Sequence, residues 1–119
     1  MVATARHGVT LDVPVRRLDD YIRNNISSPE YIRLIKTDVE GFECPILKGL
    51  ERFFEESSHR PLIVCEIRPW EVKKFGFTIG DFDRYMKRSG YDSYDMVEQN
   101  RRIDLAQLVD MEDLLFRAS

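Results

Sequence analysis

The chain has 119 residues, of which 43% are hydrophobic and 33% charged, and its formal net charge is −3. This length and composition indicate one soluble globular domain over residues 1–119 and exclude a disordered chain. The sequence has no basic stripe of the kind that indicates nucleic-acid binding. It also has no run of roughly 18 apolar residues, which a membrane span would need. No apolar signal-peptide core is visible at the N-terminus, so we expect a cytoplasmic protein that binds neither nucleic acid nor membrane.

The cysteines and histidines do not form a recognisable metal-binding pattern. Cys44 and Cys65 are too few for a disulfide scaffold and do not have the CxxC spacing that binds zinc. His7 and His59 lie far apart in the chain. We therefore expect two small buried thiols, two surface imidazoles and no metal site.

The first predicted elements are a strand and a short helix. Apolar and polar residues alternate over residues 9–16, which predicts a strand with one buried face, and Pro14 favours an edge position. Residues 16–25 predict a helix that Asp19 or Asp20 caps. The helix would bury an apolar face made of Leu18, Tyr21 and Ile22.

The middle of the chain predicts two strands that are buried on both faces. One is the apolar run over residues 32–39, and the clearer one covers residues 61–67. Strands of this kind are typical of parallel sheets. Between them an apolar stripe predicts a helix over residues 42–54, with a bend or break at Gly49.

The last third of the chain predicts a loop, a helix and two strands. Residues 68–70 read as a loop, Thr78 opens a helix with a capping-box start, and Gly90 ends that helix. A strand follows over residues 91–97. A short helix or loop then leads to a last strand near residues 114–116.

The order of these elements predicts the fold class. Helices that alternate with doubly buried strands indicate an α/β domain with a largely parallel sheet, closed by two antiparallel strands. In open parallel sheets, ligands bind at the carboxyl ends of the strands. This rule predicts a site after Lys36 and after Val64.

Ionisable residues cluster at both of these strand ends. They are Lys36, Asp38, Glu40 and Glu43 after the first strand, and Glu66 and Arg68 at the end of the second. If the strands are neighbours, we expect Lys36, Asp38 and Glu66 to converge. Because buried charges need partners, one interpretation is a structural Lys36–Glu66 ion pair, with the other acids solvated. The other interpretation is a polar site in which Asp38 is a base or a hard-metal ligand.

The residues around Asp38 resemble a family signature. The stretch IKTDVEGFECPILKGL, residues 35–50, is similar to the K-x-D-V-E-G-x-E-x-x-(V/I)-L-x-G signature of the FkbM-type methyltransferases. The segments VPVRRLDDYI, RPLIVCEI and SGYDSYDM resemble further motifs of that family. The resemblance implies a Rossmann-like class I fold and transfer of a methyl group from S-adenosylmethionine to oxygen on natural products, sugars or other small acceptors.

The same resemblance implies roles for individual residues. Asp38 would face both the acceptor substrate and the sulfonium methyl of the cofactor, where its carboxylate could accept the hydroxyl proton. Glu40 would orient the substrate, and Lys36 would position Asp38 or Glu66. The residues implied to border the acceptor are Glu43, Glu66 and Trp70, although a tryptophan in this position is also typical of a core or lid contact.

The resemblance covers only the C-terminal half of the family's fold. Class I methyltransferases bind the cofactor at a glycine-rich turn after their first strand, and no G-x-G occurs among the six glycines of this chain. We therefore expect an incomplete cofactor pocket. We also expect the strand over residues 32–38 to expose an edge that recruits a second copy or a separate N-terminal half, unless the strand over residues 9–16 covers that edge.

Two other functions stay open at this point. The chain could be a non-catalytic binding or dimerisation module derived from a methyltransferase, as the missing glycine-rich turn suggests. More remotely, Asp38 and the segment Glu66–Arg68 resemble the Asp and E-x-K residues of metal-dependent nucleases. Arginine in place of lysine, a helix between the strands and the absence of a basic surface count against a nuclease.

Overall fold

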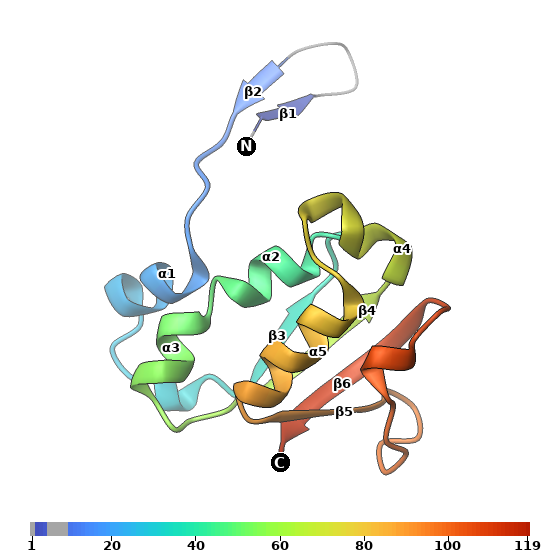
Figure 1. Cartoon of the computed structure of the whole chain (residues 1–119). Coiled ribbons are helices and arrows are strands. Elements are labelled where there is room, and N and C mark those ends of the chain that lie inside the picture. Colours follow the sequence, from blue (N-terminus) through green and yellow to red (C-terminus); the bar gives the residue numbers. More distant parts are fainter. Residues whose placement is uncertain (1, 5–9) are drawn as a thin grey trace.

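The computed structural model describes residues 2–4 and 10–119 of the chain (Figure 1). Its strands are β1 (Val2–Thr4), β2 (Thr10–Asp12), β3 (Leu34–Thr37), β4 (Leu62–Ile67), β5 (Tyr91–Asp95) and β6 (Glu112–Ala118). Its α-helices are α1 (Leu18–Asn25), α2 (Glu43–Lys48), α3 (Glu51–Glu56), α4 (Pro69–Val72) and α5 (Ile79–Arg88). Short 3₁₀ helices are η1 (Pro29–Tyr31), η2 (Lys73–Phe75) and η3 (Leu105–Gln107).

The main sheet has four strands in the order β3-β4-β6-β5. Only β3 and β4 are parallel, because β6 runs antiparallel to both of its neighbours. The prediction of a mostly parallel sheet is therefore wrong, whereas the predicted antiparallel closure is confirmed. A parallel crossover needs a connection of about a dozen residues or more, usually an α-helix. The chain from β5 to β6 contains only the one-turn helix η3 among its regular elements.

The helices pack on one face of this sheet. Along β4, Ile63, Cys65 and Ile67 are buried against the helices, whereas Leu62 on the other face is 40% exposed. Leu34 at the start of β3 is 55% exposed. Figure 1 shows α2, α3 and α5 on the same side of the strands. The predicted burial of both central strands on both faces is thus wrong for the described part of the chain.

Helix α1 is held by Asp19 rather than capped by it. The carboxylate of Asp19 accepts two hydrogen bonds from the Arg17 guanidinium, at 3.0 and 2.9 Å, and one from the backbone N–H of Arg52, at 3.0 Å. Its own N–H donates to the carbonyl oxygen of Gly49, at 2.8 Å. The N-cap position is Arg17, with no side-chain cap, so the prediction that Asp19 or Asp20 caps α1 is wrong. The carboxylate instead joins α1 to the chain between α2 and α3.

The predicted break at Gly49 is confirmed, because α2 ends at Lys48 and α3 begins at Glu51. A Cβ atom on Gly49 would lie 3.0 Å from the carbonyl oxygen of Ile46 and 3.3 Å from the backbone nitrogen of Leu18. Both distances are too short for an ordinary contact. Glycine is therefore needed here so that the start of α1 can approach the helix junction.

The N-terminal segment differs from its prediction. Strand β2 pairs with β1, and the two project from the main body on an extended linker (Figure 1). All of β2 is exposed, and Leu11 is 53% exposed, so the predicted buried face is wrong for these residues. Val9, in the same predicted strand, lies outside the described residues. The pair does not join the main sheet, so it leaves the edge of β3 uncovered.

The predictions for the start of α5, for residues 68–70 and for Tyr21 have different outcomes. The capping box of α5 is confirmed, whereas the expected loop over residues 68–70 is wrong because Pro69 begins α4. Tyr21, expected to be buried, is 49% exposed because α1 turns only Ile22 fully into the core.

The predicted burial of both thiols is confirmed. Burial raises the pKa of Cys44 to about 12 and raises that of Cys65 as well. The His59 ring is half-buried rather than on the surface, with Nε2 2.6 Å from the carbonyl oxygen of Ile32. His7 lies outside the described residues. Within the described ranges, no helix is long and apolar enough to cross a membrane.

The contact of Asp19 with α3 predicts a stability effect. Asp19→Ala removes the charged acceptor of the N–H of Arg52 in the first turn of α3, and we expect it to lower the free energy of unfolding by about 2 kcal/mol. Arg17 lowers the pKa of Asp19 below its ordinary value. The contribution of Asp19 is therefore fully present above about pH 4 and is lost as the pH falls through the lowered pKa.

Urea denaturation at pH 7 and at pH 3 measures this effect. The difference between wild type and Asp19→Ala should shrink at the lower pH. Asp20→Ala is the control, because its ion pair with Arg52 is exposed and contributes little. Equal losses in the two variants would contradict the role of Asp19.

Candidate functional site

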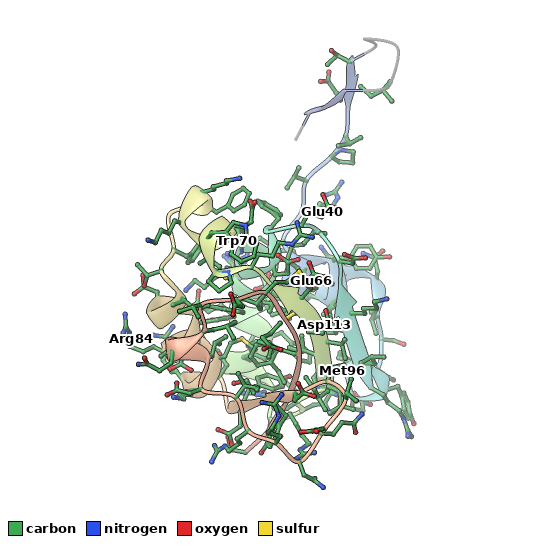
Figure 2. The ribbon with its side chains drawn as sticks, turned by 90° about the vertical axis from the view of Figure 1, so that its right-hand side faces the viewer. Glu40, Glu66, Trp70, Arg84, Met96 and Asp113 are labelled. Atoms are coloured by element: carbon green, nitrogen blue, oxygen red, sulfur yellow. The ribbon has the colours of Figure 1, made fainter. Side chains whose placement is uncertain are left out.

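The candidate site lies where β3 and β4 end side by side. The two strands are parallel neighbours, with Lys36 opposite Val64 and Thr37 opposite Cys65. The loop after β3 and helix α4 after β4 therefore meet at one end of the sheet. Figure 2 shows Glu40, Glu66 and Trp70 at this end, with Arg84 far from them on the α5 side.

The loop after β3 turns through two residues with positive φ. Glu40 has φ 47° and Gly41 has φ 102°. A non-glycine residue in the left-handed region costs about 1–2 kcal/mol, so the surrounding structure must hold Glu40 there. A Cβ atom on Gly41 would lie only 2.7 Å from the Cβ of Glu71 on α4. The glycine of the signature thus allows α4 to approach the loop.

Glu43 holds this loop from inside. The side chain is 2% exposed, and its Oε2 accepts a hydrogen bond from the N–H of Gly41 at 2.8 Å. Its Oε1 accepts a longer one from the N–H of Val39 at 3.3 Å. Both oxygens of the carboxylate therefore bind backbone of the loop. The structure assigns Glu43 a positioning role, and its expected contact with an acceptor stays a prediction.

Glu66 is paired with its own neighbour in sequence. Its Oε1 accepts a hydrogen bond from Nε of Arg68 at 2.7 Å, and both side chains are about one-third exposed or less. This hydrogen bond, with smaller contributions from the nearby carboxylates of Glu40 and Glu71, raises the pKa of Arg68. The Lys36–Glu66 pair of the structural interpretation is absent from the ion pairs of the described residues. Lys36 is exposed, and it lies opposite Val64, which is two residues before Glu66 on β4.

Asp38 and Glu40 are exposed and border a shallow hollow. The hollow lies between the loop after β3 and the linker that leads to α1. Its lining consists of Asp38, Val39, Glu40, Phe42 and Ile46 on one side and Val13–Arg16 on the other. Trp70, on α4, is 52% exposed and therefore has no core role, although its part in binding an acceptor stays a prediction.

Two features of the site could not be recognised from the sequence. One is Glu71, which packs against Gly41 and pairs with Lys74 at 2.9 Å. The other is the linker, which contributes one wall of the hollow. No spacing signal connects either segment with the D-V-E-G block. Only the three-dimensional structure shows that Gly41 lies against the side chain of Glu71, where a Cβ atom would not fit.

The arrangement offers exposed carboxylates beside an apolar wall, with a guanidinium nearby. Carboxylates in such a place can accept a proton from a hydroxyl group or face a positive charge on a ligand. Within the part of the chain that the structure describes, no group of three or more His, Cys, Asp or Glu side chains could hold a metal ion.

The chain is an α/β protein with carboxylates at the carboxyl ends of its parallel strands. Proteins of this class bind ligands at that end of the sheet. The model of the methyltransferase FkbM domain matches residues 2–93, which is more than half of the chain. The chain therefore belongs to the FkbM methyltransferase family. The match begins at residue 2, before the first of the family motifs noted above, which starts at Val13. It ends at residue 93, within β5. No curated protein and no solved structure matched the chain.

The role of Glu43 leads to a prediction about the loop. In Glu43→Gln, the side chain has one acceptor oxygen, and its amide N–H₂ faces a backbone N–H. We expect a loss of about 1–2 kcal/mol in stability. We also expect faster hydrogen exchange at the amide of Val39 or Gly41, measured by NMR. Glu55→Gln, at an exposed position on α3, is the matched control. Unchanged protection of both amides would contradict the role of Glu43.

The close approach of α4 leads to a second prediction, based on two glycines with positive φ. Gly76 has φ 82°, and its Cβ would meet nothing within 4 Å. We expect Gly76→Ala to cost about 1 kcal/mol, from backbone strain alone. Gly41→Ala adds a clash with Glu71 and should cost about 3 kcal/mol. Thermal denaturation of both variants measures the difference, and equal costs would show that Glu71 does not constrain the loop.

Proposed function

We propose that the chain supplies the acceptor side of an S-adenosylmethionine-dependent O-methyltransferase that acts on a hydroxyl group of a small molecule or sugar. The observation that carries this proposal is the FkbM-domain match, which includes the loop where Asp38 and Glu40 are exposed beside a hollow. Family membership favours methyl transfer over the phosphodiester hydrolysis considered above. We also propose a cytoplasmic location.

The residues present fit one side of the cofactor. Bound S-adenosylmethionine would supply the electrophilic methyl group. The carboxylate of Asp38 is exposed at the strand end and could face the positive sulfonium, and Glu40 could accept a hydrogen bond from a hydroxyl group of a ligand. The six glycines contain no G-x-G for the remainder of the cofactor. A complete pocket therefore requires backbone from outside this segment, from a second copy or from another chain.

The proposed roles divide between chemistry and positioning. Asp38 receives the proton that the acceptor hydroxyl loses, and Glu40 orients the acceptor. Glu43 positions both residues through the backbone of the loop. The pair of Glu66 and Arg68 borders the acceptor at the end of β4 and leaves one carboxylate oxygen of Glu66 free of this contact. Trp70, on the exposed side of α4, offers an apolar wall for the acceptor.

The second candidate function is a non-catalytic binding or dimerisation module. The uncovered edge of β3 and the exposed Leu34 and Leu62 favour this alternative, because they are surfaces that another chain could cover. A module of this kind would keep the folded site but would not bind the cofactor.

Isothermal titration with S-adenosylhomocysteine, the product of the cofactor, separates the two functions. The methyltransferase proposal predicts micromolar binding that Asp38→Ala abolishes. Glu55→Ala is the control, because it removes an exposed carboxylate from α3 and should leave binding unchanged. Circular dichroism shows whether each variant is folded.

The outcome assigns the chain to one function. Binding that depends on Asp38 would support methyl transfer and justify a screen of hydroxyl acceptors. No heat of binding from a folded wild-type sample would contradict cofactor binding by this chain on its own and favour the module. Binding that survives Asp38→Ala would contradict the role proposed for Asp38.

A further inference from the structure

A second hollow, of about 250 Å³, lies between the end of α2 and one face of α5, and we call it the α2–α5 hollow. Figure 2 shows Arg84, at its border, far from Glu40 and Trp70 of the candidate site. Ligand pockets commonly measure about 300–1,000 Å³, so this hollow suits one functional group of a ligand better than a whole large molecule. Its lining includes Lys48, Phe77, Asp81, Arg84, Tyr85 and Arg88.

The lining of the α2–α5 hollow is positively charged, although the whole chain has a net charge of −3. It combines three cations with one carboxylate, that of Asp81. This carboxylate is fixed by the capping box, because one oxygen accepts from the N–H of Thr78 at 3.2 Å and the other from the guanidinium of Arg84. Asp81 therefore neutralises Arg84, and the charges of Lys48 and Arg88 remain.

Lys48 and Arg88 share one carboxylate outside the lining. Oε1 of Glu51 lies 3.6 Å from Nζ of Lys48 and 3.7 Å from Nη2 of Arg88. Both distances are too long for a hydrogen bond, so this oxygen faces two cations without binding their N–H groups. Their donors are therefore available to an anion, which can replace Glu51 as the partner of both.

The ring of Tyr85 holds these two cations beside the hollow. Tyr85 is buried, and its hydroxyl donates a hydrogen bond to the carbonyl oxygen of Leu47 at 2.6 Å, which fixes the ring. The ring centroid is 4.7 Å from Nζ of Lys48 and 5.8 Å from the guanidinium carbon of Arg88. Cations within about 6 Å of a ring centroid are attracted by the ring. The cations are thus held in place before a ligand arrives, which lowers the cost of binding.

We infer that the α2–α5 hollow binds a dianionic phosphate group through Lys48, Arg84 and Arg88. A phosphate monoester carries a charge of about −1.5 to −2 at pH 7, which matches the excess of positive charge in the lining, whereas a carboxylate carries only one charge. Guanidinium groups can donate two parallel hydrogen bonds to phosphate, and a lysine adds a point charge. Phe77 offers an apolar contact for the remainder of a ligand. The inference rests on this hollow and its charges, and it does not depend on methyl transfer.

An NMR titration of the isotope-labelled chain at pH 7.5 and low salt tests the inference with three probes. Phenyl phosphate should shift the amide signals of Lys48, Tyr85 and Arg88 with a Kd of about 1 mM or below. Phenyl sulfate has the same shape but one charge, and it should bind roughly tenfold more weakly. Inorganic phosphate distinguishes the two sources of the group. Tighter binding of phenyl phosphate would indicate a phosphate monoester, and equal binding would indicate the free ion.

Four single substitutions connect the binding to these residues. Lys48→Gln and Arg88→Gln should each weaken the binding of phenyl phosphate by roughly tenfold or more. Lys87→Gln is the matched control, because it removes the same charge from the neighbouring position on α5, where the ammonium group pairs with Asp83 at 3.0 Å outside the hollow. It should leave the affinity nearly unchanged. Glu51→Gln removes the carboxylate that competes with the phosphate and should tighten binding.

Three results would each overturn the inference. They are no shift of α5 signals in the folded wild type, equal affinities for phenyl phosphate and phenyl sulfate, and equal losses in Lys87→Gln and Arg88→Gln. If the spectrum shows that Lys48→Gln or Arg88→Gln unfolds the chain, Glu51→Gln decides, because it keeps every cation. Unchanged or weaker binding in this variant would contradict the inference. None of the probes is the cofactor or its product, so this failure is distinguishable from failure of the proposed function.

Discussion

The carboxylate of Glu43 is buried beneath the loop that follows β3, and the candidate site depends on its two hydrogen bonds to the backbone of that loop. Without them, Glu40 has no evident reason to stay at φ 47°, because the left-handed conformation is unfavourable for glutamate. Gly41 completes the turn and leaves space for Glu71 on α4. The signature therefore combines two exposed acids, Asp38 and Glu40, with a glycine and a buried acid that fix their backbone.

A second contact connects two blocks of the family signature into one structural unit. The Asp19 carboxylate binds the N–H of Arg52, and the N–H of Asp19 binds the carbonyl oxygen of Gly49. The start of α1 and the end of the signature thus meet at the junction of α2 and α3. This junction supports the helices that cover one face of the sheet. In the described residues, the other face of the sheet and the outer edge of β3 are not covered.

Much of the fold could be predicted from local patterns. The helix break at Gly49 and the capping box at Thr78 depend on neighbouring residues, so spacing was sufficient to find them. The burial of residues 32–39 could not be predicted in the same way, because an apolar run does not say whether one face or both are covered. The hydrogen-bond partners of Glu43 and Glu66 could not be predicted from the sequence either. Whether a carboxylate turns inward to backbone N–H groups or pairs with a nearby guanidinium depends on geometry that residue spacing does not contain.

The central claim is that the exposed acids at the carboxyl ends of β3 and β4 form the ligand site of this methyltransferase-family chain. An NMR titration of the isotope-labelled chain with S-adenosylhomocysteine tests it residue by residue. We predict that the amide signals of Val39, Glu40 and Gly41 shift, together with those of α4, while those of α5 stay unchanged. Shifts confined to α5, or a spectrum of a folded chain that does not change at all, would contradict it.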